Sequence, residues 1–318
     1  MIPVINGSWF EFKHNLDVEG KYWNHTCLGF SATQWREKIR EMAELGMDYL
    51  VLMGIAYNGE TFYPSKYFNQ YYMDCKNPLE AFFQATSEYN IKVFVSNDFL
   101  GNWRDPKKMI TDAKIIKKRQ QAMEEVVALY GHYQSFYGWY WPNEAEISPY
   151  YSAEFIRYVN DCTELGHQLL PDSKTLIAPY GTNKVITDDH YAKQLEQLNV
   201  DIIAYQDEVG VQKSKVGDLA RYFENLKQVH DKVGKSEIWA DVEIFNFEGE
   251  VYKSALIPAP FARIEKQLDA IAPFVNKILV YQYLGMMNKS GTETFAGHPN
   301  SEQLYNDYAA YLKTNSLA

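Results

Sequence analysis

The feature that most constrains the fold of this chain is a regular alternation of short apolar segments with longer amphipathic ones. Eight segments rich in β-branched and aromatic residues are predicted to be strands, at positions 4–10, 49–55, 92–97, 136–141, 175–180, 201–206, 237–244 and 277–283. Each is followed by a stretch whose apolar residues recur at helical spacing. Eight strand-then-helix units are what a closed parallel barrel requires. The sequence therefore predicts an α/β fold, a single (β/α)8 TIM barrel.

Local signals mark the starts of two of the helices. Ser31 and Gln34 have the spacing of a capping box, in which each side chain satisfies a backbone N–H of the first turn. Asn77 precedes Pro78, a residue favoured at the first helical position, and Glu80 follows in the first turn. Both signals place a helix directly after a predicted strand and its loop.

Two further observations favour one barrel over other α/β arrangements. The first strand continues into the segment 9–14 without the GxGxxG loop that usually follows the first strand of a doubly wound sheet. No low-complexity stretch, charge block or Pro/Gly/Ser linker divides the chain. We therefore expect one catalytic barrel domain over residues 1–318.

Charge and hydropathy narrow the classes of partner. Lys and Arg number 31 against 41 Asp and Glu, which gives a formal charge of −10, so we expect neither nucleic acid nor a membrane surface as a partner. No apolar run approaches the ~20 residues of a bilayer span. Three cysteines without CxxC spacing predict reduced packing residues, with neither a disulfide framework nor a zinc site.

The first residues lack the basic and apolar regions of a signal peptide. This predicts a cytoplasmic protein, or a secreted or periplasmic one if a leader has been removed. The oligomeric state is left open by the sequence.

Aromatic residues make up 15% of the chain, with 25 Tyr, 17 Phe and 7 Trp. Their side chains combine an apolar face with, in Tyr and Trp, a polar group, which suits ligands that are partly apolar and partly hydroxylated. The composition therefore indicates a carbohydrate ligand.

The carboxyl ends of the predicted strands carry the catalytic candidates, because that end of a barrel holds the active site. The fourth strand ends in Trp141, and Pro142 stops its ladder, so Asn143 and Glu144 follow at the rim. On the seventh strand, period-two alternation puts Asp241 and Glu243 on the same face as Trp239. Carboxylates facing the apolar helix layer would be costly, so this face is predicted to point into the barrel mouth.

Glu144 and Glu243 thus end strands on opposite sides of the barrel and are predicted to face each other across a pocket. Two carboxyl groups in this relation are what glycosidic cleavage needs: one protonates the leaving oxygen while the other attacks or activates water. We therefore predict that these two residues are catalytic.

The remaining strand ends supply candidate substrate contacts. The residues expected to stack on sugar rings are Trp9, Tyr63, Trp103, Trp141 and Tyr180. Those expected to bind hydroxyl groups or to surround the catalytic pair are Asn97, Asn143, Tyr205, Asp207, Asp241, Tyr281 and Gln282. The long segment 56–77 is expected to cover part of the mouth, because loops of this length are usually functional.

Several short motifs resemble known families. Asn143-Glu144 after the fourth strand and Glu243 on the seventh resemble the clan A retaining glycoside hydrolases. The chain also resembles the bacterial family called domain of unknown function 4434, a set of barrel proteins assigned as glycosyl hydrolases. The segments that carry this likeness are 6–10, 45–48, 62–65, 138–144, 205–210 and 239–245.

The clan A resemblance implies that Glu144 is the acid/base, that Glu243 is the nucleophile, and that the configuration of the sugar is retained. Within the family pattern, Glu208 stands where a small residue is expected.

Two other functions are compatible with the sequence. Glu144, Asp207 and Glu243 could hold Mg²⁺ or Mn²⁺ in a metal-dependent sugar isomerase or epimerase, since hard cations prefer oxygen. The chain could also be a carbohydrate-binding barrel without turnover. The glycosidase hypothesis needs no metal and no cofactor. Of the seven histidines, those expected near the mouth are His14, His25, His190 and His298.

Overall fold

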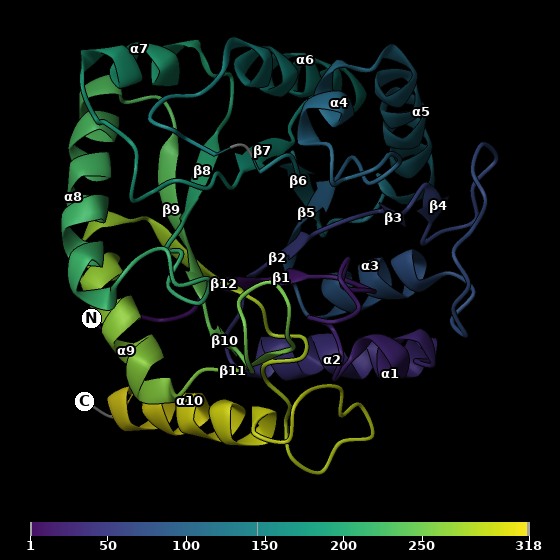
Figure 1. Ribbon diagram of the computed structural model, residues 1–318. Helices are drawn as coiled ribbons and strands as arrows, with labels where there is room; N and C mark the ends of the chain where they lie inside the picture. Colours follow the sequence, from purple (N-terminus) through teal and green to yellow (C-terminus); the bar gives the residue numbers. More distant parts are fainter. Residues whose placement is uncertain (1, 145, 317–318) are drawn as a thin grey trace.

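A computed structural model describes residues 2–144 and 146–316 of the chain (Figure 1). Eight parallel strands form a closed barrel, in the spatial order β1-β12-β9-β8-β7-β6-β5-β2. Their bounds are β1 (Gly7–Phe10), β2 (Tyr49–Leu52), β5 (Lys92–Ser96), β6 (Phe136–Tyr140), β7 (Lys174–Ile177), β8 (Ile202–Gln206), β9 (Glu237–Glu243) and β12 (Lys277–Tyr281). Seven of them lie within the segments predicted to be strands, and β7 begins one residue before its segment, so the prediction of a (β/α)8 barrel is confirmed.

Helices surround the barrel and follow the strands in turn (Figure 1). The principal ones are α2 (Ala32–Glu44), α3 (Pro78–Glu88), α5 (Ala113–Tyr130), α6 (Ala153–Leu169), α7 (Asp189–Gln197), α8 (Val216–Val233), α9 (Phe261–Ile271) and α10 (Ser301–Ser316). The shorter ones are α1 (Asn24–Leu28), α4 (Pro106–Thr111) and the 3-10 helix η1 (Ala272–Phe274). In the described part of the chain, no helix is both long enough and apolar enough to cross a bilayer.

Two small antiparallel hairpins lie outside the barrel sheet. One pairs β3 (Ala56–Tyr57) with β4 (Glu60–Thr61), and the other pairs β10 (Phe245–Phe247) with β11 (Leu256–Pro258). The second hairpin follows β9 almost immediately, so its connecting loop lies at the carboxyl end of the barrel. That position brings the loop residue Tyr252 into the pocket described below.

The predicted helix starts are present. The Oγ of Ser31 accepts a hydrogen bond from the Gln34 amide, and the Gln34 side chain accepts one from the Ser31 amide, so the capping box is complete. Asn77 accepts a hydrogen bond from the Glu80 amide, and Pro78 occupies the first helical position of α3. These contacts satisfy N–H groups that a helix start otherwise leaves without partners.

The apolar core has two layers, one inside the barrel and one between the barrel and the helices. The inner layer includes Trp9, Phe94, Tyr140 and Trp239, which pack against one another through edge-to-face ring contacts. The outer layer is larger and includes the buried faces of all the principal helices. The three cysteines are free, buried thiols, as predicted. The barrel interior is therefore a packed core, and a ligand can only bind above it.

The alternation predicted for β9 is confirmed. Trp239 belongs to the inner layer, whereas Ala240 and Val242 belong to the outer one. Asp241 and Glu243 share the face of Trp239, at successively higher levels of the strand. The barrel thus directs both carboxyl groups toward its carboxyl end.

The close contact of β6 with β7 generates a prediction. A Cβ atom at Gly138 would lie 2.1 Å from the backbone oxygen of Lys174, so Gly138→Ala must push the two strands apart. We expect a loss of roughly 1–3 kcal/mol in the free energy of unfolding, measured by urea denaturation. Gly217→Ala is the matched control, because a Cβ there meets no atom within 4 Å and alanine favours the helix by up to about 1 kcal/mol. Equal stability of the two variants would contradict the strand contact.

Candidate active site

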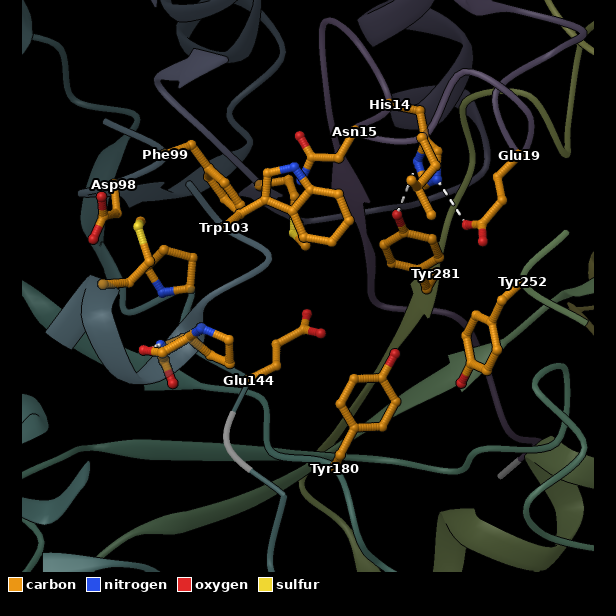
Figure 2. Close-up of a pocket in the computed structure, with 16 residues that line it drawn as sticks. His14, Asn15, Glu19, Asp98, Phe99, Trp103, Glu144, Tyr180, Tyr252 and Tyr281 are labelled. Carbon is orange, nitrogen blue, oxygen red and sulfur yellow. Dashed lines mark hydrogen bonds and ion pairs between the residues drawn. The ribbon is translucent and has the colours of Figure 1, made fainter. Parts of the chain in front are cut away.

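A pocket of about 300 Å³ opens at the carboxyl end of the barrel (Figure 2). Its walls come from the loop after β1, the loop after β5 with α4, the segment after β6, and the ends of β7, β9 and β12. The lining residues are His14, Asn15, Leu16, Glu19, Met53, Asp98, Phe99, Trp103, Pro106, Met109, Pro142, Asn143, Glu144, Tyr180, Tyr252 and Tyr281. Acidic and aromatic side chains dominate this lining, as the strand ends predicted.

A smaller cavity of about 80 Å³ continues this pocket toward β9. The two cavities share six lining residues, Glu19, Met53, Glu144, Tyr180, Tyr252 and Tyr281. The inner cavity adds Glu243 and Gln206. Glu144 and Glu243 therefore line one continuous space, although they come from strands β6 and β9, which are separated in the barrel by β7 and β8.

Glu144 follows the end of β6, where Pro142 cannot continue the ladder. Its carboxyl group points into the pocket between Trp103 and Tyr180 (Figure 2). Its Oε1 accepts a hydrogen bond from the Tyr140 hydroxyl at 3.2 Å. Burial raises the pKa of Glu144 to about 7, against the opposing effect of its polar contacts with Tyr140 and Gln206. This carboxyl group therefore holds a proton at a pH where an exposed one has lost it.

Glu243 ends β9 and is 2% exposed. Its Oε2 accepts a hydrogen bond from the Val211 amide at 2.8 Å. That approach needs Gly210, because a Cβ there would lie 3.0 Å from the same Oε2 and 2.8 Å from the Phe245 oxygen. Burial, and then the neighbouring Asp207 carboxylate, raise the pKa of Glu243 well above its usual range.

Asn143, Tyr205 and Tyr281 were expected as donors around the catalytic pair, but the donor that reaches Glu243 is a backbone amide of the turn after β8. The turn is tight. Glu208 has a φ of 55°, in the left-handed region that glycine adopts most readily.

Asp241 lies one level below Glu243 and is also buried. Its Oδ1 has no hydrogen-bond partner among the described residues. Burial, together with the charges of Glu243 and Glu144, raises its pKa well above the usual range. The floor of the site therefore holds a carboxyl group whose surroundings favour its protonated form.

His14 forms the opposite wall with two carboxylates. Its Nδ1 lies 2.8 Å from Glu11 Oε1, and its Nε2 lies 3.0 Å from Glu19 Oε2. Burial alone would lower the pKa of His14, but Glu11 and Glu19 outweigh it and raise the pKa to about 9. Glu11 also accepts hydrogen bonds from Trp23 Nε1 and from Gln282 Nε2. One imidazolium is thus shared by two carboxylates at the edge of the pocket.

Four of the predicted substrate-binding residues line the pocket. Trp103 and Tyr180 present their rings beside Glu144, and Tyr281 lies between Glu144 and His14 (Figure 2). Asn143 also lines the pocket, where its Nδ2 donates to the Pro106 oxygen. These four remain candidates for contact with a sugar.

Two predicted stacking residues lie elsewhere. Trp141 is fully buried on the outer face of β6, where it stacks on Trp139 and donates its Nε1–H to Thr163 of α6. Trp9 is buried inside the barrel against Tyr140. Neither ring borders either of the two cavities. These positions do not support the stacking role expected of them. Trp141 points to the outer layer, because it neighbours a residue that lines the pocket, and Trp9 lies in the packed core below the pocket.

Four other predicted contacts belong to the layer between barrel and helices. Tyr63 packs edge-to-face on Tyr130 of α5, and Asn97 donates to Met123 and Cys162. The Tyr205 hydroxyl bonds with Tyr191 and His230, and Asp207 accepts from Gln267 of α9. All four are buried at strand ends or in loops but face outward. Their expected contact with a ligand is not supported by these positions.

Gln282 is buried beside the pocket wall, where its Nε2 donates to Glu11 at 2.6 Å. This hydrogen bond fixes Glu11 and so supports the Glu11–His14–Glu19 cluster. Gln282 does not itself line either of the two cavities.

The segment 56–77 does not cover the mouth as expected. The cavity walls that the structure describes contain none of its residues. Its Ser65 and Lys66 instead bond to Glu125 of α5, so the segment packs along the flank of the barrel beside α3 and α5 (Figure 1). The loop after β5, which carries Phe99 and Trp103, forms that wall of the pocket.

Glu19 and Tyr252 line the pocket although neither was a predicted site residue. Each lies nine residues beyond the end of the preceding barrel strand, β1 or β9, and the fold of the loop brings it back to the pocket. His14 was expected near the mouth and is there, but its pairing with Glu11 and Glu19 depends on that same loop. The sequence signal that could have indicated this pairing is the spacing of the two glutamates, since Glu11 lies three residues before His14 and Glu19 five residues after it.

The carboxylates proposed for a divalent cation are not brought together. Asp207 is turned toward Gln267, away from the space shared by Glu144 and Glu243. Within residues 2–144 and 146–316, no group of three or more His, Cys, Asp or Glu side chains is placed to hold a metal ion. The arrangement needed for the isomerase hypothesis is therefore missing from the described residues.

The fold and the pocket define a (β/α)8 barrel protein with an acidic, aromatic site at the carboxyl end of its strands. The chain belongs to the family described as Domain of unknown function (DUF4434), whose sequence pattern matches residues 5–293. No curated protein sequence matches it.

Several solved structures share the fold. A Bacteroides thetaiotaomicron protein described as a "putative alpha-L-fucosidase" is 18% identical, with a TM-score of 0.78 over 98% of this chain and 94% of that one. The endo-β-1,4-mannanase of Thermotoga petrophila is 12% identical, with a TM-score of 0.63 over 99% and 77%. A β-galacturonidase from Eisenbergiella tayi is 13% identical, with a TM-score of 0.57 over 97% and 51%. At these identities the likeness shows the fold, and the neighbours that share it are glycoside hydrolases.

The His14 cluster generates a prediction. Because the folded pKa of about 9 lies above the usual value of 6.5, the stability that this ion pairing provides is complete below about pH 6.5 and is lost as the pH rises through about 9. We expect NMR titration of ¹⁵N-labelled protein to show His14 doubly protonated near neutral pH. Glu19→Gln should lower the midpoint of that titration. A neutral His14 ring at about pH 7 would contradict the assignment.

Proposed function

We propose that this protein is a retaining glycoside hydrolase in which Glu144 is the general acid/base and Glu243 the nucleophile. The observation that carries the proposal is that these two carboxyl groups line one space at the carboxyl end of the barrel, while burial raises the pKa of Glu144 to about 7. Glycosidic cleavage needs a carboxylic acid that keeps its proton near neutral pH and a second carboxyl group opposite it.

The proposed reaction has two steps. In the first, Glu144 donates its proton to the glycosidic oxygen while the Glu243 carboxylate attacks the anomeric carbon, so the bond to the leaving group breaks and a glycosyl ester forms. In the second, Glu144 removes a proton from water, the water oxygen attacks the anomeric carbon, and Glu243 leaves as a carboxylate. Both carboxyl groups return to their starting states.

Neighbouring groups assist each role. The Tyr140 hydroxyl holds Glu144 in place from below. The Val211 amide fixes the Glu243 carboxyl and favours its ionised form, while burial and Asp207 disfavour that form. Glu243 must lose its proton before it can attack, so its raised pKa sets the acidic side of the pH range of activity.

The walls of the pocket suit a sugar ring. Trp103 and Phe99 offer aromatic faces on the side of the β5 loop, and the hydroxyl groups of Tyr180, Tyr252 and Tyr281 border the space next to Glu144. Aromatic faces cover the C–H surface of a sugar, and the tyrosine hydroxyls can donate to or accept from its hydroxyl groups. We therefore propose Trp103, Asn143, Tyr180 and Tyr281 as substrate-binding residues.

The roles of the two carboxyl groups predict a bell-shaped dependence of kcat/KM on pH, measured on aryl glycosides chosen from a panel. Activity should fall as the pH rises through about 7, because the acid form of Glu144 is lost there. The midpoint of the acidic, rising limb of the profile should lie above the usual pKa of a glutamate, because the pKa of Glu243 is raised. Glu144→Gln should lower activity by roughly 10²–10⁴-fold and remove the alkaline limb.

Glu146→Gln is the control for this experiment, because Glu146 is exposed, pairs with Lys184 and lies outside both cavities. It should keep the rate and the pH profile of the unmodified protein. A Glu144→Gln variant that retains both rate and alkaline limb would remove Glu144 from the mechanism. Retained activity in Glu243→Gln would do the same for Glu243.

The stereochemical outcome provides a separate prediction. A nucleophilic Glu243 requires a carboxyl separation near ~5–5.5 Å in the substrate complex and yields a product of retained configuration, whereas inversion needs ~6.5–9.5 Å. We expect ¹H NMR of the first product formed to show the anomer of the substrate. Inverted product from an active enzyme would make Glu243 a general base and leave Glu144 as the acid.

A further inference from the structure

The charges of the cluster around His14 do not balance, because Glu11 and Glu19 share one imidazolium. Burial raises the pKa values of Glu144, Glu243 and Asp241 and so disfavours their charged forms, which places the excess of negative charge in the His14 cluster. Glu19, Glu144 and Glu243 border the joined cavities, and Asp241 lies directly beneath. The positively charged groups nearby are already engaged. Both ring nitrogens of His14 are held by carboxylates.

Other cations near the pocket are engaged as well. Arg119 is bound to Asp98 through Nε and Nη2, at 2.8 and 2.6 Å. Lys213 lies 3.9 Å from Glu208 and over the ring of Tyr180 at 4.6 Å. Arg263, beside Glu243, donates to Asn246 Oδ1 and to the main-chain oxygens of Glu243 and Phe245. The carboxylate left without a cation of its own therefore belongs to the His14 cluster, where Glu11 and Glu19 share one imidazolium.

Two of the acids have an oxygen without any partner among the described residues. Glu19 is 7% exposed, and while its Oε2 bonds to His14, its Oε1 is unpartnered. Asp241 is 3% exposed, and its Oδ1 is unpartnered. A buried acceptor without a donor is unfavourable. Asp241 lines neither cavity, so the oxygen placed to meet a ligand's donor group is Oε1 of Glu19.

Glu19 is the one of the two that borders the pocket directly. It lines both the outer pocket and the inner cavity, so it stands at their junction with Glu144. In Figure 2 its carboxyl group lies beside the pocket, on the side of His14 and Tyr252. Glu19, Glu144, Glu243 and Tyr252 line the same inner cavity. Burial first, and then the nearby carboxylates, raise the pKa of Tyr252.

We propose that the sugar bound next to Glu144 is an amino sugar with a free, protonated amine, and that Glu19 binds this amine through Oε1. The proposal deepens the proposed function and rests on it, because it names the substrate class of the same site. An ammonium group brings three donors, which the unpartnered oxygen of Glu19 lacks, and one positive charge, which the two carboxylates around His14 lack. A hydrogen bond between two charged groups is about twice as strong as one between neutral groups.

The charges and hydrogen-bonding groups around the pocket disfavour other sugars. A uronic acid, the kind of sugar on which the β-galacturonidase neighbour acts, would place another carboxylate among Glu19, Glu144 and Glu243. An N-acetyl group removes the positive charge of the amine and two of its donors. A neutral hydroxyl could reach Glu19 but would leave the charge excess in place.

The test compares monosaccharides that differ in one group, by ligand-observed NMR on the unmodified protein at about pH 6, where the amine is protonated. One series is glucosamine, glucose, N-acetylglucosamine and glucuronate, and the other contains the corresponding galactose compounds. In the series that binds, we expect the amino sugar to bind roughly tenfold more tightly than the neutral sugar, which corresponds to about 1.4 kcal/mol. The uronate and the N-acetyl sugar should bind more weakly than the amino sugar.

Glu19→Gln keeps the size of the side chain and removes its charge, so it should abolish the preference for the amine. Glu250→Gln is the matched control, because it removes the same charge from an exposed residue of the nearby β10–β11 loop that pairs with Lys253. It should leave the preference intact. If Glu19→Gln does not fold, the comparison of sugars on the unmodified protein decides alone.

Equal binding of amino and neutral sugars, tighter binding of the uronate, or no measurable binding of either amino sugar would overturn the proposal. So would an amine preference that survives in a folded Glu19→Gln variant. These outcomes are independent of the hydrolase assignment, which the activity of Glu144→Gln and Glu243→Gln tests. A hydrolase without an amine preference would refute only the substrate class, and an amine preference without hydrolysis would refute only the reaction.

Discussion

Closure of the barrel through β1 is the constraint on which the rest of the structure depends. Gly7 pairs with Leu279 of β12 on one side and with Tyr49 of β2 on the other, so the first strand joins the last to the second. The contact is close, because a Cβ on Gly7 would lie 2.2 Å from the Tyr49 oxygen. With the sheet closed, every strand ends at the same rim, and groups distant in the sequence face one pocket.

The buried carboxyl groups at this rim are the least favourable feature of the fold. Asp207, Asp241 and Glu243 are each buried within a few residues of a strand end, and burial together with their mutual repulsion raises the pKa values of Asp241 and Glu243. A chain selected only for stability would not gather acids in this way. Perturbed carboxyl groups in a pocket are typical of catalytic sites, which is the physical basis for the proposed hydrolase.

The proposed substrate links this electrostatic feature to the mechanism. A protonated amine bound at Glu19 would bring positive charge to the space that Glu144 and Glu243 share. Positive charge nearby favours the ionised form of a carboxyl group, so the ligand would help Glu243 to lose its proton. The carboxyl groups of the pocket and the positive charge of its ligand would then act together in the reaction.

Sequence patterns predicted the fold far better than they predicted the pocket lining. The eight strands, the caps of α2 and α3, and the inward face of Asp241 and Glu243 all follow from local chemistry and from periods of 2 and 3.6 residues. Side-chain direction at single strand ends was not predictable in the same way. The register shift between β5 and β6, opposite Val93 and Phe94, adds a residue to β6 ahead of Trp139, and the resulting alternation turns Trp141 outward.

The sequence by itself determined that this chain forms a closed (β/α)8 barrel with acidic and aromatic residues at one end, because strand and helix periodicity and the order of elements are local properties. The tertiary structure alone decided which of those residues meet. It brought Glu19 and Tyr252 into the pocket from long loops and sent the segment 56–77 to the flank of the barrel. Loop paths depend on contacts between distant segments, which no local pattern encodes.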